Sequence, residues 1–186
     1  VVTNELADFD GNLIVLYGDT PFVSAETMAK MENECKQADL VVLGFHPQDP
    51  TGYGRLVTKD KELLRIVEHN DANDQELAIT LCNSGVMAGN AQLIKTLLKE
   101  LDNNNNNNEI YLTDCIELAK AEGLMSTYLT CDPTEALGIN SLEELGYAEK
   151  KFQEKARNVA LKDGVNLVAP ETVFFSLDTV LGQDTV

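Results

Sequence analysis

Apolar residues of this chain gather in short runs that alternate with segments of helical periodicity. Residues 13–17 (LIVLY) and 40–45 (LVVLGF) are almost wholly apolar, as in strands that are buried on both faces of a parallel sheet. Between them, Ser24 is a good N-cap for an amphipathic helix that continues to Gln37. We therefore predict a strand–helix–strand unit with a right-handed crossover in a parallel sheet.

The alternation of strands and helices continues along the chain. The predicted elements are a hairpin of strands 55–58 and 63–67 around Lys59 and Asp60, a strand at 81–87, a helix at 91–101, a helix that Thr113 caps and that ends at Gly123, and a strand at 124–129. Six consecutive asparagines at 103–108 favour a surface loop. The pattern as a whole predicts an α/β fold.

The pattern changes after Asn140. Apolar residues recur near a 3.5-residue period as far as Val159, and five of the 14 basic residues of the chain follow Asn140, so we predict one long connecting helix. From position 168 the period becomes six residues, because apolar side chains recur at Val168, Phe174, Val180 and Val186. Hexapeptide periodicity is typical of a parallel β-helix.

Composition excludes several classes of function. The 186 residues include 31 acidic and 14 basic side chains, and the formal net charge of -17 would repel a nucleic acid. No apolar run approaches the roughly 20 residues that cross a bilayer, and residues 1–12 lack the features of a secretion signal. Four cysteines without a CxxC pair are expected to stay reduced and partly buried. We expect a cytoplasmic protein with no nucleic-acid or membrane partner.

Asp19 is the first candidate for chemistry. It follows the predicted strand at 13–17, and ligands of open α/β sheets bind beyond the carboxyl ends of the strands. A carboxylate at that place can hold Mg2+ beside a phosphate. The residues GDTP at 18–21 are also typical of a plain turn, in which aspartate is common.

Three further residues have both a structural and a ligand-binding interpretation. Gly54, in the loop DPTGYGR, either lets a ligand approach the backbone or only permits a tight turn. Glu68, at the end of a strand, can accept paired hydrogen bonds from a sugar or face solvent. Asn83 lies inside an apolar run, where its amide needs either a ligand or the open side of an edge strand. His46 and His69 have no recognisable catalytic partner, and we interpret both as structural or exposed.

Six short motifs, taken in order and spacing, resemble one family of enzymes. They are LYGDTP (16–21), DPTGYGR (49–55), IVEH (66–69), NSGV (83–86), YLTD (111–114) and GIN (138–140). The family is that of the bacterial bifunctional N-acetylglucosamine-1-phosphate uridyltransferase and glucosamine-1-phosphate acetyltransferase. Each motif alone is weakly specific, whereas six in series before a hexapeptide repeat are strongly specific. The resemblance covers the whole chain.

The resemblance implies that UTP and N-acetylglucosamine 1-phosphate react to give UDP-N-acetylglucosamine and pyrophosphate, with Mg2+. The positions that match substrate-binding residues of the family are Tyr17, Gly18, Asp19, Gly54, Glu68, Asn83 and Asn140. Among them, Asp19 and Asn140 match the metal ligands, and Tyr17 and Gly18 match the lining of the nucleotide-sugar site. Gly54, Glu68 and Asn83 match positions that contact the N-acetylglucosamine group. No general base is expected, because the attacking sugar-phosphate oxygen is already an anion.

The resemblance also implies a domain organisation. Residues 1–142 would be a Rossmann-like nucleotidyltransferase domain of the GT-A type without its N-terminal part, 143–163 a linker helix, and 164–186 the start of a left-handed parallel β-helix. The phosphate-binding loop of the family would precede Val1, so we expect a fragment that is inactive alone. In the complete protein, the β-helix would form a homotrimer and acetylate glucosamine 1-phosphate from acetyl-CoA. The product would supply peptidoglycan and lipopolysaccharide synthesis.

Two alternative functions stay open from the sequence. The first is another sugar-1-phosphate nucleotidyltransferase with a hexapeptide tail, which would use glucose or mannose 1-phosphate. Glu68, Asn83 and the loop DPTGYGR favour the N-acetylated sugar instead. The second is a non-catalytic regulatory subunit of the same fold. Retention of both Asp19 and Asn140 argues against it, because a silent relative does not need a complete pair of metal ligands.

Overall fold

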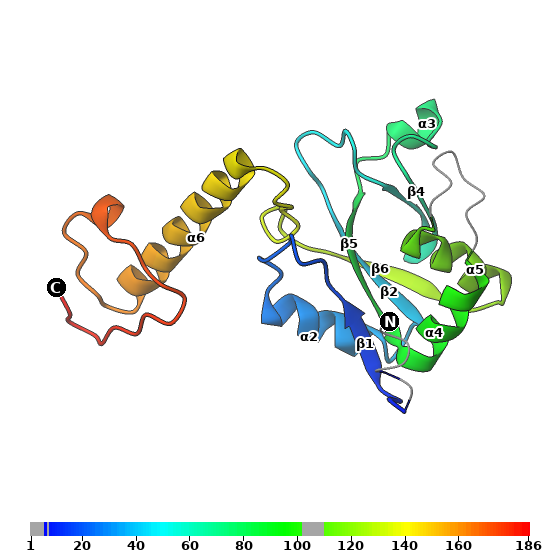
Figure 1. Cartoon of the computed structure of the whole chain (residues 1–186), viewed down its shortest axis with the longest axis horizontal. Coiled ribbons are helices and arrows are strands. Elements are labelled where there is room, and N and C mark those ends of the chain that lie inside the picture. The colour runs from blue at the N-terminus through cyan, green and yellow to red at the C-terminus, as the bar shows by residue number, and fades with distance from the viewer. Residues whose placement is uncertain (1–5, 7, 102–109) are drawn as a thin grey trace. The chain divides into compact units, whose positions relative to one another are not determined.

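The computed structural model describes residue 6 and residues 8–101 and 110–186, so the asparagine run lies outside the described residues. The chain divides into two compact units, Val1–Leu137 and Gly138–Val186, which are described separately below. The first unit contains a six-stranded mixed sheet with helices on both faces (Figure 1).

The sheet combines parallel and antiparallel pairs. Its strands lie in the order β1 (Asn12–Val15), β5 (Cys82–Asn90), β2 (Leu40–Phe45), β6 (Ser126–Thr130), β4 (Glu62–Val67) and β3 (Arg55–Lys59). β2 and β6 are parallel, whereas β5 runs antiparallel to both β1 and β2. β1 and β2 therefore point the same way, but β5 separates them, and Gly89 faces Leu13 on one side and Leu40 on the other. The parallel sheet predicted for the strand–helix–strand unit is wrong, because β5 lies between its two strands and runs antiparallel to both.

β1 lies at the edge of the sheet. The sequence predicted a strand at 13–17 that is buried on both faces, but the strand ends at Val15 and its residues are at most half-buried. Leu16 and Tyr17 follow it and are 43% and 44% exposed. This prediction is wrong because an edge strand has a neighbour on one side only, and an apolar run alone does not reveal that position.

Helices cover the two faces of the sheet. Met31 of α2 (Ala25–Glu34) packs on one face with Val41 and Leu43. On the other face, α4 (Ala91–Glu100) and α5 (Cys115–Ala121) contribute Leu97 and Ile116 to a core with alternate residues of β2 such as Val42. Successive side chains of a strand point to opposite faces, so β2 joins both cores and is buried throughout, as its apolar run predicted.

Side chains cap the starts of α2 and α4. The hydroxyl of Ser24 accepts a hydrogen bond from the N–H of Thr27, as predicted for α2. Asn90, the last residue of β5, caps α4 in the same way. The predicted cap by Thr113 is wrong, because Thr113 lies inside a 3-10 helix, η1 (Leu112–Asp114), and α5 starts without a side-chain cap. The hydroxyl of Thr113 instead donates a hydrogen bond to Glu68, which follows β4.

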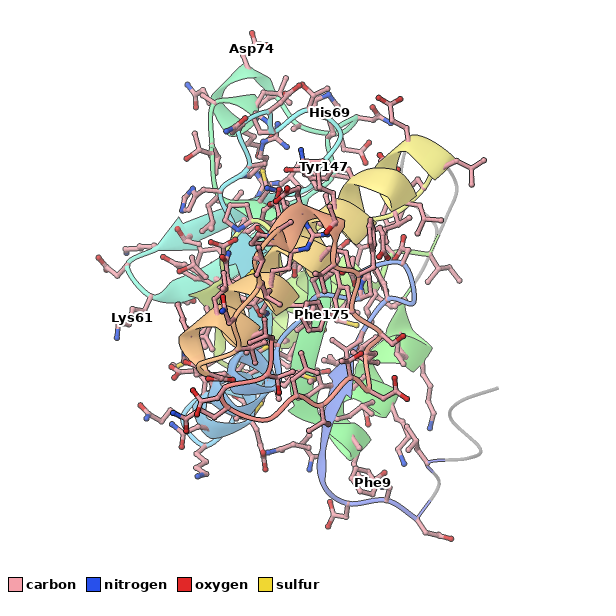
Figure 2. All side chains as sticks on the ribbon, turned by 90° about the vertical axis from the view of Figure 1, so that its left-hand side faces the viewer. Phe9, Lys61, His69, Asp74, Tyr147 and Phe175 are labelled. Carbon is pink, nitrogen blue, oxygen red and sulfur yellow. The ribbon has the colours of Figure 1, made fainter. Side chains whose placement is uncertain are left out.

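The hairpin of β3 and β4 is confirmed. It turns at Asp60, whose φ of 57° is in the left-handed region that aspartate tolerates in turns. Lys61 at this turn and Asp74 at the start of α3 (Asp74–Leu77) both point outward into solvent (Figure 2). Glu76 of α3 forms an ion pair with Arg65 of β4, which ties this short helix to the hairpin.

The second unit consists of one long helix and an irregular C-terminal segment. Helix α6 (Leu142–Lys162) confirms the predicted long helix. It is capped by Ser141, whose hydroxyl accepts a hydrogen bond from the N–H of Glu144. The buried Gln153 bonds both backbone groups of Phe175. Arg157 donates to the carbonyl of Val173 and lies over the ring of Phe174. These contacts hold the segment against the helix.

Residues 164–186 contain the 3-10 helix η2 (Pro170–Thr172), and no strand is assigned to them. Backbone hydrogen bonds from Asn166 N to Thr185 O, at 2.8 Å, and from Asp184 N to Gly164 O, at 3.0 Å, close the segment into a loop. A parallel β-helix forms its ladders between successive coils, and residues 164–186 contain no such ladder. The predicted β-helix start therefore stays a prediction.

The four cysteines are free thiols, of which Cys82 and Cys115 are buried and Cys35 and Cys131 half-buried, as predicted. Burial raises the pKa of Cys115 to about 11, and burial with the nearby charges of Glu135 and Asp132 raises that of Cys131 to about 12. Within the described parts of the chain, no helix combines the length and apolar character that a membrane span requires.

Candidate functional site

The register of three strands brings together Gly54, Glu68 and Asn83. Arg55 at the start of β3 is opposite Val67 of β4 and also opposite Cys82 of β5. Gly54, which precedes Arg55, therefore lies next to Glu68 and Asn83, which follow Val67 and Cys82. The N–H of Asn83 donates to the carbonyl of Gly54 at 2.8 Å, and a Cβ placed on Gly54 would lie 3.2 Å from Oε2 of Glu68. The carboxylate of Glu68 and the side chain of Ile66 thus occupy the space that a side chain at position 54 would need.

The Asn83 side chain has one internal partner. Its Oδ1 accepts a hydrogen bond from the N–H of Gly85 at 3.0 Å, and the residue is half-buried within β5. Among the described residues, its amide nitrogen has no hydrogen-bond partner, so its two N–H groups remain as donors. An asparagine inside an apolar strand thus keeps donors available next to Gly54 and Glu68.

Tyr17 packs against Gly85. Gly85 has a φ of +86°, and a Cβ at this position would overlap the Tyr17 ring at Cε2 and Cδ2. The pKa of the Tyr17 phenol is raised above its usual 10.0, first by burial and then by the negative charges of Glu68 and Asp19. Tyr17 therefore lies within electrostatic reach of both acids and keeps its proton at neutral pH.

Asp19 lies in a turn after β1. The N–H and the hydroxyl of Thr20 both donate to the carbonyl of Tyr17, at 3.3 Å and 3.0 Å, so Gly18 and Asp19 occupy the bend. Both are exposed. Within the described part of the chain, the Asp19 carboxylate forms no hydrogen bond or ion pair. This acid is thus available to a ligand.

Asn140 belongs to the second unit, so its pairing with Asp19 stays a prediction. It is exposed, and its backbone N–H donates to Oε2 of Glu144 at 2.6 Å. The described residues contain no group of three or more histidine, cysteine or acidic side chains that would form a metal site by themselves. The carboxylate of Asp19 is the type of ligand that Mg2+ takes, because this ion binds through one or two carboxylates together with substrate phosphates.

The sequence did not indicate the role of Thr113. Its hydroxyl donates to Oε1 of Glu68 at 3.0 Å, although the two residues are 45 positions apart. The side chain is only 7% exposed. The motif YLTD contained the residue, but a threonine before a helix is typical of an N-cap, and no pattern reveals a partner on a distant strand.

Two polar groups near this site are buried without a partner in the described chain. Arg55 is 2% exposed and donates to the carbonyl of Tyr53, while its Nε has no partner. The Nδ1 atom of the half-buried His69 is likewise unpaired. His46 is exposed and lies 3.3 Å from the hydroxyl of Thr80. The interpretation of His46 as exposed is confirmed.

Curated relatives match almost the whole chain. It is 51% identical over 181 residues to the bifunctional protein GlmU of Roseobacter denitrificans, which covers 97% of this chain. It is 52% identical over 179 residues to the protein of the same name from Ruegeria sp. strain TM1040, with 96% of this chain covered. This chain is a homologue of the GlmU proteins. It spans about 40% of the length of these relatives.

Solved structures support the fold. A nucleoside-diphosphate-sugar pyrophosphorylase from Vibrio cholerae RC9 matches with a TM-score of 0.60 and 16% identity, over 78% of this chain and 60% of that one. A UDP-glucose pyrophosphorylase matches with a TM-score of 0.56 and 17% identity, over 83% of this chain and 59% of that one. The first unit thus has the Rossmann-like fold of nucleotidyltransferases, which the sequence predicted. No protein-family model matches the sequence.

Proposed function

We propose that the natural protein that contains this chain transfers UMP from UTP to N-acetylglucosamine 1-phosphate and releases pyrophosphate. The proposal rests on the proximity of Gly54, Glu68 and Asn83 in a homologue of GlmU. These residues place a carboxylate acceptor and an amide donor around a glycine backbone. Such groups suit a sugar that carries hydroxyl and acetamido groups.

Each of these residues has a distinct part in holding the sugar. The Glu68 carboxylate accepts hydrogen bonds from sugar hydroxyls, and the free amide donors of Asn83 bind sugar oxygens. Gly54 leaves room for Oε2 of Glu68 beside its backbone. Tyr17, a neutral phenol held on Gly85, forms with Gly18 the adjoining wall for the nucleotide sugar.

The reaction needs alignment more than proton transfer. A phosphate oxygen of the sugar phosphate attacks the α-phosphorus of UTP, a new P–O bond forms, and the bond to the β-phosphate breaks to release pyrophosphate. The nucleophile is already an anion, so no residue has to remove a proton. Asp19 and Asn140 supply oxygen donors that suit Mg2+, which when bound neutralises the phosphate charge. The other residues orient the sugar phosphate for attack.

The names of the relatives support a second activity of the whole protein. Its relatives are named bifunctional. We propose that the complete protein also acetylates glucosamine 1-phosphate from acetyl-CoA and assembles as a homotrimer through a β-helix that begins after α6. Hexapeptide periodicity at Val168, Phe174 and Val180 supports this part of the proposal.

Pyrophosphate release tests the proposal. The natural full-length protein is given UTP and Mg2+ with either N-acetylglucosamine 1-phosphate or glucose 1-phosphate. We expect strong preference for the N-acetylated sugar. Preference for glucose 1-phosphate would assign the protein to another class of sugar-phosphate nucleotidyltransferase, and absence of release with both sugars would favour a regulatory subunit.

A further inference from the structure

The two carboxylate oxygens of Glu68 have different neighbours. Oε1 accepts the hydrogen bond from the Thr113 hydroxyl at 3.0 Å, whereas Oε2 faces the backbone of Gly54. A carboxylate has about four lone-pair positions, so one hydrogen bond from threonine leaves the others for a ligand. The contact thus orients the acid without saturating it.

The surroundings of Thr113 hold its side chain in place. The residue is buried in the 3-10 turn η1, which packs against β4, the strand that Glu68 follows. Glu68 itself lies one residue beyond the last strand residue, where no ladder restrains its side chain. The terminal torsion of glutamate is broad, and the charged side chain loses considerable rotamer freedom when a ligand immobilises it. A hydrogen bond that restrains the acid beforehand reduces this loss on binding.

We propose that Thr113 is a positioning residue for sugar binding, which acts through the Glu68 carboxylate and sets its orientation toward Gly54. The inference rests on the proposed function, because it takes the sugar phosphate as the ligand of Glu68. It adds a residue of a separate helical turn to the sugar subsite. Thr113 does not contact the reacting atoms, so it affects how well the sugar phosphate is held and leaves the chemical step unchanged.

A matched pair of variants separates the hydroxyl from the rest of the side chain. Thr113→Val keeps the shape and removes the donor, while Thr113→Ser keeps the donor and removes a methyl group. Pyrophosphate release by the full-length protein is measured with N-acetylglucosamine 1-phosphate varied at saturating UTP, and then with UTP varied. We expect Thr113→Val to raise KM for the sugar phosphate about tenfold, with kcat and KM for UTP unchanged. Thr113→Ser should stay within about twofold of the unsubstituted protein.

Three results would overturn the inference. They are an unchanged sugar KM in Thr113→Val, an equal rise in both KM values, and a rise in Thr113→Ser as large as that in Thr113→Val. If thermal unfolding shows that Thr113→Val is not folded, Thr113→Ala removes the same donor without inserting a new methyl group, and the same KM rise is required of it. Failure of the proposed function is distinct, since the unsubstituted protein would then release no pyrophosphate with this sugar.

Discussion

The side chain of Gln153 pairs with both backbone groups of Phe175, as a neighbouring strand would. Its Nε2 donates to the Phe175 carbonyl at 2.8 Å, and its Oε1 accepts from the Phe175 N–H at 2.7 Å. Gln153 is 4% exposed, so water does not readily replace these bonds. One amide on helix α6 thus holds a segment that has no strand of its own.

Removing this amide should loosen the C-terminal segment. Gln153→Leu leaves two backbone groups of Phe175 without partners, and we expect the second unit to lose about 2–3 kcal/mol of stability. Hydrogen exchange measured by NMR should show faster exchange of the Phe175 amide. Lys155→Ala, on an exposed position of the same helix, is the control and should leave this amide protected. Unaltered protection in Gln153→Leu would contradict the role of the pair.

Gly85 and Gly52 provide a matched test of the Tyr17 contact. Both have positive φ, +86° and +83°, but a Cβ at Gly52 meets nothing within 4 Å, whereas one at Gly85 meets the Tyr17 ring. Gly52→Ala should cost about 1–2 kcal/mol from backbone strain alone. Gly85→Ala should cost more, and the excess should diminish when Tyr17→Ala is added. Chemical denaturation of the four variants measures the difference, and equal losses at the two glycines would exclude a tight Tyr17 contact.

The ionisation of Tyr17 reports its acidic neighbours. Its pKa lies above 10.0 because of burial, then Glu68, then Asp19. Glu68→Gln should therefore lower this pKa, and Asp19→Asn should lower it less. Because the folded state favours the neutral phenol, its contribution to stability is complete below pH 10 and is lost as the pH rises through the raised pKa.

NMR titration of the Tyr17 ring, assigned with Tyr17→Phe, measures these shifts. Glu62→Gln, on an exposed position at the start of β4, is the control and should leave the value unchanged. An unchanged Tyr17 pKa in Glu68→Gln would show that the two side chains are not close in solution.

Asp19 is predicted to bind the metal ion. In the natural full-length protein, Asp19→Asn keeps the shape of the side chain and removes its charge, so we expect turnover to fall at least about a hundredfold and partly recover at high Mg2+. Asp19 is exposed, and the melting temperature should therefore stay unchanged. Asp178→Asn, another exposed acid, is the control. A normal rate at low Mg2+ in Asp19→Asn would remove this residue from the metal site.

Much of the candidate site could be predicted because its chemistry lies in short motifs. Gly54, Glu68 and Asn83 were recognised from residue type and position, and the structure brings them together. Their proximity is not visible in the sequence, because it depends on Arg55 facing Val67 and Cys82 at once. A glycine before a strand predicts an open backbone, whereas strand register decides which acid lies beside it.

The sequence by itself determined the local elements of this protein. Apolar runs and helical periods indicated its main strands and helices, and Ser24 indicated a helix start, because these signals act between residues that are near in the chain. Only the tertiary structure decided that β5 enters between β1 and β2, that Tyr17 rests on Gly85, and that Thr113 bonds Glu68. Such contacts join residues far apart in the chain, where the choice of partner depends on the packing of the whole sheet and no local pattern records it.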